Sequence, residues 1–138
     1  MEGFEKDGYG KRILLIDDDD DIRILLSEVL SQEGYDVYEA QNGAEGLREM
    51  GKRHHDAVLS DYHMPRMDGT TFLEISRMVW PETPVILASC DPEFIEGSAN
   101  LARGAYACLS KPFELDRLLE TVMSATEQSA RQLQQSTV

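Results

Sequence analysis

The stretch "ILLIDDDDDIRILLSEVL", residues 13–30, joins four aliphatic residues to five consecutive aspartates and then to an apolar repeat. The run at residues 13–16 is continuously apolar, which is typical of a parallel strand buried on both faces. After the aspartates, apolar residues recur at helical spacing and predict one inward-facing stripe, made of Ile22, Leu25, Leu26, Val29 and Leu30. A buried strand, an acidic turn and an amphipathic helix are the first unit of a parallel α/β sheet.

The same alternation continues along the chain. Short apolar runs predict four further strands, at residues 36–40, 56–61, 84–89 and 107–109. The segments between them predict a short helix with Asn42 as its N-cap, a helix closed by Trp80-Pro81, one at about residues 92–103, and a last one after Lys111-Pro112. We therefore expect an α/β fold with a doubly wound, five-stranded parallel sheet and five helices, in the flavodoxin-like strand order 2-1-3-4-5.

Length and charge limit the classes of function. With 138 residues, 41% of them hydrophobic, the chain is long enough for one domain with its own core. It carries 26 acidic against 13 basic residues, and this net charge of −13 disfavours direct binding to nucleic acid. No apolar run reaches the roughly 18 residues of a membrane helix, and the N-terminus lacks the apolar core of a signal peptide. We expect a cytoplasmic protein that does not contact a membrane.

Cysteine and histidine residues form no zinc motif. Cys90 and Cys108 are not part of a Cys-x-x-Cys pair, and reduced structural thiols fit a reducing compartment better than a redox pair does. His54 and His55 are adjacent and cannot share one face of a helix, so we expect both in a solvated loop.

The five aspartates, residues 17–21, have three competing interpretations. A calcium loop would place its ligands at positions 1, 3, 5 and 12, which are Asp17, Asp19, Asp21 and Glu28. That loop requires glycine at position 6, where this chain has Ile22, the first residue of the helical stripe. A helix cap explains Asp19 to Asp21, because carboxylates satisfy the free N–H groups of a helix start. It leaves Asp17 and Asp18 unexplained.

The third interpretation is a site for a small hard cation. Asp17 and Asp18 follow the first strand directly, and Asp61 ends the third strand. The carboxyl ends of neighbouring parallel strands meet at one edge of the sheet, where open α/β folds bind their ligands. Three carboxylates at that edge suit Mg²⁺. The fourth strand ends in Ser89 and the fifth in Lys111, so a hydroxyl and a cation complete the parts of a phosphoryl-transfer site.

With these residues the chain resembles the receiver domain of two-component response regulators, the family of the chemotaxis regulator. The resemblance covers residues 11–124 and is carried by "LLIDDD", "DAVLSDYHMPRMDG", "PVILAS" and "SKPF". It implies that Asp61 is the phosphoacceptor that attacks a phosphohistidine. It implies that Mg²⁺ is held by Asp17, Asp18, Asp61 and the backbone carbonyl of His63. It also implies that Ser89 is the switch hydroxyl, that Lys111 contacts the phosphoryl group, and that a cis peptide precedes Pro112.

Partners follow from the same resemblance. A sensor histidine kinase or phosphotransfer protein would donate the phosphoryl group. A downstream protein or output domain would bind the surface formed by the helix at 92–103, the strand at 107–109 and the last helix. Because the chain would catalyse only its own phosphorylation and dephosphorylation, we do not expect a conventional enzyme. Residues 1–10 are an N-terminal extension, residues 125–138 are the end of the last helix and a polar tail or linker start, and a homodimer is compatible with the pattern.

One position departs from the family pattern. The family commonly has Tyr or Phe three residues before the lysine, where this chain has Cys108. Two alternatives therefore stay open. One is a receiver-like interaction module that does not switch by phosphorylation. The other is an aspartate-nucleophile phosphatase, which Asp21 in place of a threonine and the short chain disfavour.

The five aspartates are thus expected to divide into metal ligands, Asp17 and Asp18, and a loop and helix cap, Asp19 to Asp21. If so, Asp18→Ala abolishes Mg²⁺-dependent phosphorylation, whereas Asp20→Ala changes only stability, and slightly.

Overall fold

The computed structural model describes residues 8–91 and 99–136. The strands are β1 Arg12–Ile16, β2 Asp36–Ala40, β3 Ala57–Asp61, β4 Val85–Ser89 and β5 Ala107–Ser110. The helices are α1 Asp20–Gln32, α2 Gly43–Lys52, α3 Gly69–Val79, α5 Ala99–Ala102 and α6 Leu115–Ser136. Strands and helices alternate along these residues, as the sequence predicts.

All strand pairs are parallel, and the sheet has the order β2-β1-β3-β4-β5. The predicted flavodoxin-like order 2-1-3-4-5 is therefore confirmed, with five helices in the part of the chain that is described. The chain first places β2 on one side of β1 and then places β3, β4 and β5 on the other side. The carboxyl end of β1 is therefore the point where the strand order reverses.

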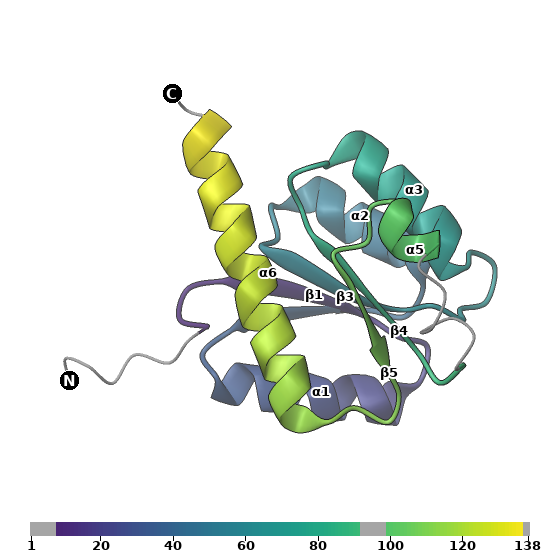
Figure 1. The fold of residues 1–138 in the computed structure, drawn as a ribbon. Helices are drawn as coiled ribbons and strands as arrows, with labels where there is room; N and C mark the ends of the chain where they lie inside the picture. The colour runs from purple at the N-terminus through teal and green to yellow at the C-terminus, as the bar shows by residue number, and fades with distance from the viewer. Residues whose placement is uncertain (1–7, 92–98, 137–138) are drawn as a thin grey trace.

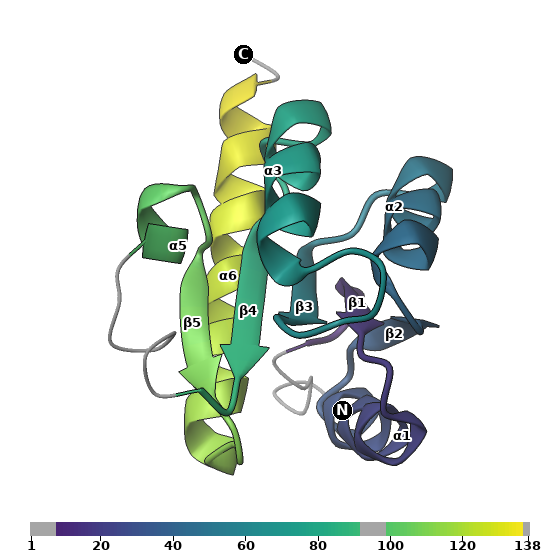
Figure 2. The same ribbon diagram turned by 90° about the vertical axis from the view of Figure 1, so that its right-hand side faces the viewer.

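Helices cover both faces of the sheet, as Figure 1 and Figure 2 show. On one face, α1 and α6 pack against β1, β3, β4 and β5 through a cluster that includes Leu26, Leu30, Leu118 and Val122. On the other face, α2 and α3 contribute Met50, Phe72 and Leu73 to a second cluster. Alternate residues of the central strands enter the two clusters, for example Leu15 the first and Leu14 the second, which is why these strands are apolar at every position.

The buried face of α1 differs from the predicted stripe. Its buried residues are Arg23, Leu26 and Leu30, while Leu25 is 57% exposed. The face is turned toward Arg23 because that side chain finds hydrogen-bond acceptors beneath the helix, which compensates for burial of its charge. Leu25 lies instead on an open apolar groove, together with Ile22 and Val29.

The prediction that both His54 and His55 are solvated is wrong for His55, which is 1% exposed. His55 directly precedes the β3 region and packs edge-on against Tyr38 of β2, with ring centroids 5.5 Å apart. Two adjacent histidines cannot share one helix face, but one of them can still be buried beside a strand.

Three predicted segments are described only in part or are continuous with others. Of the helix expected at residues 92–103, Ala99–Ala102 is observed as α5, and residues 92–98 lie outside the described residues. Residues 1–7 of the expected N-terminal extension also lie outside them. Helix α6 continues across residue 124 to Ser136, with Ala125 and Ser129 buried. Among the described residues, no helix is long and apolar enough to cross a membrane.

Candidate metal centre

Parallel pairing brings the predicted site residues to one edge of the sheet. Asp17 follows β1, Asp61 ends β3 and pairs with Ala88, and Ser89 pairs with Ser110, which precedes Lys111. One carboxylate oxygen from each of Asp17, Asp18 and Asp61 lies within 4.8 Å of the other two. The three carboxylates that the sequence assigned to one cation therefore meet in space, although their metal-binding role stays a prediction.

Asp17 is held on several sides. Its backbone N–H donates to the carbonyl of Ala40 at 3.2 Å. Its Oδ1 accepts the N–H of Asp19 at 2.9 Å, and its Oδ2 accepts Lys111 Nζ at 3.1 Å. Asp17 is 5% exposed, so these bonds provide the stabilisation that a buried carboxylate needs.

Lys111 also reaches the proposed phosphoacceptor. Its Nζ lies 3.4 Å from Asp61 Oδ1. Burial raises the pKa of Asp61, and the negative charge of Asp17 acts in the same direction, while Lys111 partly offsets both. Burial also opposes the charged form of Lys111, but Asp61 and Asp17 outweigh it, so its pKa is raised. Asp61 is thus a poorly solvated carboxylate next to the positive charge of Lys111.

The remaining aspartates form the start of α1. Asp19 is the N-cap, and its Oδ1 accepts the N–H groups of Asp21 and Ile22 at 3.0 and 3.2 Å. Asp20 and Asp21 lie in the first helical turn, where their charge suits the helix dipole. The calcium-loop interpretation fails, because residues 20–32 are helix and the preceding element is a strand.

Ser89 and His63 flank Asp61. Ser89 is 1% exposed, and its Oγ accepts the backbone N–H of Asp91 at 3.0 Å, so the hydroxyl is engaged at the end of its own strand. A backbone hydrogen bond from His63 lowers the pKa of Asp61 and so favours its charged form. The roles of the Ser89 hydroxyl and of the His63 carbonyl stay predictions.

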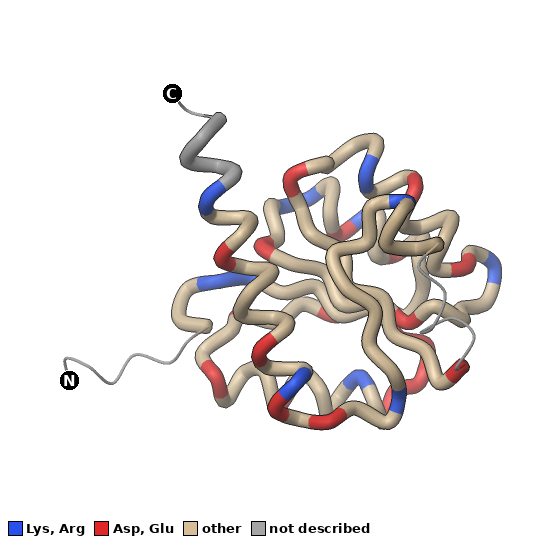
Figure 3. The backbone as a smooth tube through the Cα atoms, viewed as in Figure 1, with Lys and Arg blue, Asp and Glu red and all other residues tan. Residues whose placement is uncertain are grey.

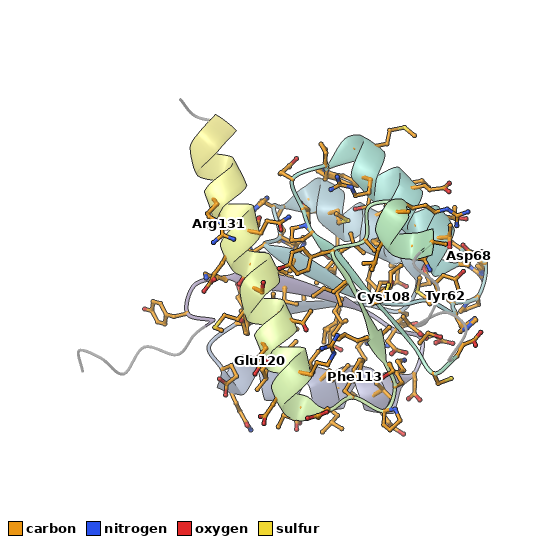
Figure 4. The ribbon with its side chains drawn as sticks, viewed as in Figure 1. Tyr62, Asp68, Cys108, Phe113, Glu120 and Arg131 are labelled. Carbon is orange, nitrogen blue, oxygen red and sulfur yellow. The ribbon has the colours of Figure 1, made fainter. Side chains whose placement is uncertain are left out.

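Cys108 occupies the position of the usual aromatic residue. It pairs with Leu87 and packs against the cluster on the α2 and α3 face, where burial raises the pKa of its thiol. Tyr106 packs against the opposite face, and its hydroxyl bonds Ser124 of α6, so it does not replace the missing ring. Figure 4 labels Cys108 together with Phe113, which lies in the turn from β5 to α6. The peptide between Lys111 and Pro112 is cis, as predicted.

Arg23 is the residue of this region that sequence reasoning missed. Its guanidinium donates to the carbonyl of Asp17 at 2.7 Å, and it lines the same small cavity as Asp61 and Lys111. The signal was present in "DDDDDIRILL": a lone cation two residues after five carboxylates is their nearest countercharge in the chain.

The donor set fits Mg²⁺. Carboxylate oxygens are the ligands this ion prefers, and it commonly takes few of them, with water and phosphate oxygens completing its shell. Asp17 is buried, Asp61 is half-buried and Asp18 is exposed, so the cluster opens toward solvent on one side. An anionic substrate and an ion can therefore both approach this edge.

Comparisons with known proteins agree with this fold. A model of the response regulator receiver domain matches residues 13–123. The chain is 37% identical over 118 residues to the transcriptional regulatory protein GlrR of Escherichia coli (strain K12), covering 86% of this chain and 27% of that protein. It is 35% identical over 114 residues to sporulation initiation phosphotransferase F of Bacillus subtilis (strain 168), covering 81% of this chain and 90% of that protein. The chemotaxis response regulator CheY4 of Vibrio cholerae is similar in structure, with a TM-score of 0.77, 32% identity and coverage of 83% of this chain and 98% of that one.

The match to the receiver-domain model places this sheet, with its acidic cluster at the carboxyl edge, among regulatory domains rather than conventional enzymes. The chain belongs to the response regulator receiver family of two-component systems. It spans about a quarter of the length of the first curated relatives, 27% of GlrR and 25% of the regulatory protein AtoC of Escherichia coli (strain K12).

Proposed function

We propose that this receiver domain accepts a phosphoryl group on Asp61, with Mg²⁺ bound by Asp17, Asp18 and Asp61. The observation that carries the proposal is the convergence of these three carboxylates within 4.8 Å, with Lys111 Nζ 3.1 Å from Asp17 and 3.4 Å from Asp61. A carboxylate nucleophile beside a cation and a dication site has the charge distribution that phosphoryl transfer requires.

In the proposed reaction, a carboxylate oxygen of Asp61 attacks the phosphorus of a phosphohistidine. The oxygen–phosphorus bond forms as the nitrogen–phosphorus bond breaks, and the imidazole nitrogen keeps the electron pair. When bound, Mg²⁺ neutralises charge on the phosphoryl oxygens, and the His63 carbonyl would be a further ligand. The distance of 3.4 Å from Lys111 Nζ to Asp61 Oδ1 supports a role for Lys111 in binding one of those oxygens.

Phosphorylation would then act as a switch through charge. The acyl phosphate offers more negative charge and more acceptor oxygens than the bare carboxylate. The Ser89 hydroxyl would leave its bond with the Asp91 N–H and donate to the phosphoryl group, which would draw in the chain at Cys90 and Asp91. The surface of α5, β5 and α6 follows that segment in the chain, and a downstream protein or output domain would bind there.

Labelling with a small phosphodonor tests the assignment of Asp61. Acetyl phosphate with Mg²⁺ should add one acid- and base-labile phosphoryl group to the wild type and none to Asp61→Asn. Asp56→Asn is the matched control, because Asp56 is a partly buried carboxylate that accepts the Arg12 N–H at 2.7 Å, before β3 rather than after it. Label that survives in Asp61→Asn would contradict the assignment, whether or not Asp56→Asn is labelled.

Cys108 favours a second candidate function, an interaction module that does not switch by phosphorylation. The family commonly has an aromatic ring at this position, which couples the site to the surface of α5, β5 and α6. Cys108 has no ring, so that coupling residue is missing. The complete set of Asp17, Asp18, Asp61 and Lys111 argues for the first candidate. Millimolar Mg²⁺ that leaves NMR shifts and thermal stability of the wild type unchanged would favour the second.

The wider setting of the domain is also part of the proposal. A sensor histidine kinase or a phosphotransfer protein would be the donor, in the cytoplasm, and a homodimer stays a prediction. We propose that this domain does not bind nucleic acid directly. The proposal is restricted to the domain because relatives such as GlrR are named as transcriptional regulators. The boundaries at residues 11 and 124 are likewise proposals.

A further inference from the structure

Arg23 of α1 connects three parts of the chain around the acidic edge. Its Nη1 donates to the backbone carbonyl of Asp17 at 2.7 Å, its Nη2 to Asp20 Oδ1 at 2.6 Å and its Nε to Glu39 Oε1 at 3.0 Å. These acceptors follow β1, start α1 and belong to β2, respectively. Only 9% of the Arg23 side chain is exposed, whereas Asp20 is 70% and Glu39 is 37% exposed.

The bond to Asp17 acts on the proposed metal ligands through the backbone. The carbonyl that Arg23 binds belongs to the peptide between Asp17 and Asp18. Fixing that peptide sets the directions in which the two carboxylates leave the chain. The Asp17 carboxylate has further bonds, to the Asp19 N–H and to Lys111. Asp18 is exposed, so its direction depends more strongly on the backbone.

Charge alone would give Arg23 the opposite effect. A guanidinium near the site repels a dication, so its positive charge by itself weakens metal binding. A lysine keeps that charge but lacks the planar fork that can reach three acceptors at once. If Arg23 acts by positioning the carboxylates, its replacement should lower the affinity for Mg²⁺. If it acts only through its charge, replacement by a neutral residue should raise that affinity, so an experiment can separate the two effects.

We propose that Arg23 is a positioning residue for metal binding, which holds the peptide between Asp17 and Asp18 so that both carboxylates converge with Asp61 on one cation. Asp20 and Glu39 in turn hold the guanidinium in place. The inference rests on the proposed function of the Asp61 site, since it assumes that the three carboxylates bind Mg²⁺.

Mg²⁺ titration without a phosphodonor tests this role, with the backbone amide NMR shifts of Asp17 to Asp19 as the readout. Arg23→Lys should weaken Mg²⁺ binding about tenfold, the order expected when one charge-assisted hydrogen bond to the site is lost. Arg23→Met should weaken it less, because it also removes a charge that repels the ion. Arg53→Lys is the matched control. Arg53 also pairs with a carboxylate, Glu49 at 2.7 Å, but it follows α2 and stacks on Tyr38, so Mg²⁺ affinity should not change.

Two results would overturn the proposal. Arg23→Met that binds Mg²⁺ more tightly, with Arg23→Lys equal to the wild type, would show that only the charge matters. Folded variants with unchanged affinity and lower melting temperature would show a structural role alone. If Arg23→Met does not fold, Glu39→Gln keeps the guanidinium and weakens one of its bonds, because a neutral amide oxygen replaces the charged acceptor. It should weaken binding by about threefold, and wild-type affinity in both Arg23→Lys and Glu39→Gln would overturn the role of Arg23.

The wild-type titration separates this inference from the proposed function. If the wild type binds Mg²⁺ and the Arg23 variants bind it equally well, only the role of Arg23 fails. If the wild type does not bind Mg²⁺, the proposed function fails first.

Discussion

Two cations make the carboxylate cluster stable at the scale of single residues. Lys111 bonds the side chain of Asp17 and lies 3.4 Å from Asp61, while Arg23 bonds the Asp17 backbone. They come from opposite ends of the sequence, and each approaches the cluster from a different element. Adjacent carboxylates that repel one another are tolerated here because fixed positive charges lie among them.

His55 is a second buried titratable residue, and we expect it to make stability depend on pH. Burial lowers the pKa of His55, and the nearby charges of Arg12 and Arg53 act in the same direction, against Glu49. The unfolded chain, with a pKa near 6.5, therefore binds a proton more readily than the folded protein. The contribution to stability is full above pH 6.5 and is lost as the pH falls below it, by at most about 1.4 kcal/mol per pH unit.

Urea unfolding between pH 7.5 and pH 5 measures this dependence. His55→Phe keeps an aromatic ring beside Tyr38 and should flatten the slope, while His54→Gln should keep most of it, because the buried imidazole remains. A wild-type slope in His55→Phe would mean that other groups cause the acid sensitivity.

At the scale of elements, two of the three glycines of α2 lie in very different surroundings. A Cβ at Gly46 would lie 2.4 Å from Ile16 Cδ1 and 3.3 Å from Phe72 Cε1, and both of those side chains are buried. A Cβ at Gly51 would have its nearest neighbour, Trp80 Cζ2, at 4.0 Å. The absence of a side chain at Gly46 is therefore what lets α2 approach β1 closely.

Substitution by alanine should have opposite effects at these two positions. Gly46→Ala forces a shift in a packed core and should destabilise the protein by about 1–3 kcal/mol. Gly51→Ala gains helix propensity without a clash and should stabilise it by up to about 1 kcal/mol. Urea midpoints of both variants check the pair, and a stabilised Gly46→Ala would show that Ile16 can move aside at little cost.

The elements themselves were predictable from the sequence, and their orientation was less so. The strand ends at Asp61 and Ser89 and the N-cap Asn42 follow from local signals, namely apolar runs, turn residues and capping side chains. The rotation of α1 does not, because Leu25 of the predicted stripe is exposed while Arg23, outside that stripe, is buried. An apolar stripe is broad, and the acceptors beneath α1 that allow Arg23 to be buried come from β2 and from the backbone of Asp17.

The candidate site was predictable for the same reason that the strands were. In a parallel sheet, the residue after each strand reaches the same edge, so Asp17, Asp61 and Lys111 could be placed together from strand ends alone. Arg23 and Glu39 could not, since their contact depends on how α1 is rotated over β2. His55 was misjudged because its burial depends on packing against Tyr38, which lies far from it in sequence.

At the scale of the whole molecule, negative charge is distributed rather than gathered. Figure 3 shows acidic positions along most of the described backbone, with basic positions interspersed. With 26 acidic and 13 basic residues, the folded protein carries a net charge of −13, and compact folding brings these charges closer together. Salt screens this general repulsion, but it does not bridge three particular carboxylates.

Mg²⁺ should therefore stabilise the protein more than monovalent salt of equal ionic strength. An ion that binds only the folded state at ten times its dissociation constant adds about 1.4 kcal/mol, or roughly 2–6 °C in melting temperature for a domain of this size. Asp18→Ala should abolish the difference between the two salts, while Asp21→Ala should keep it. Asp21 is a better control than Asp20, because Asp20 bonds Arg23. Thermal melts of the three proteins in both salts are the measurement, and equal loss in Asp18→Ala and Asp21→Ala would mean that the run of aspartates acts as diffuse charge rather than as two ligands followed by a helix start.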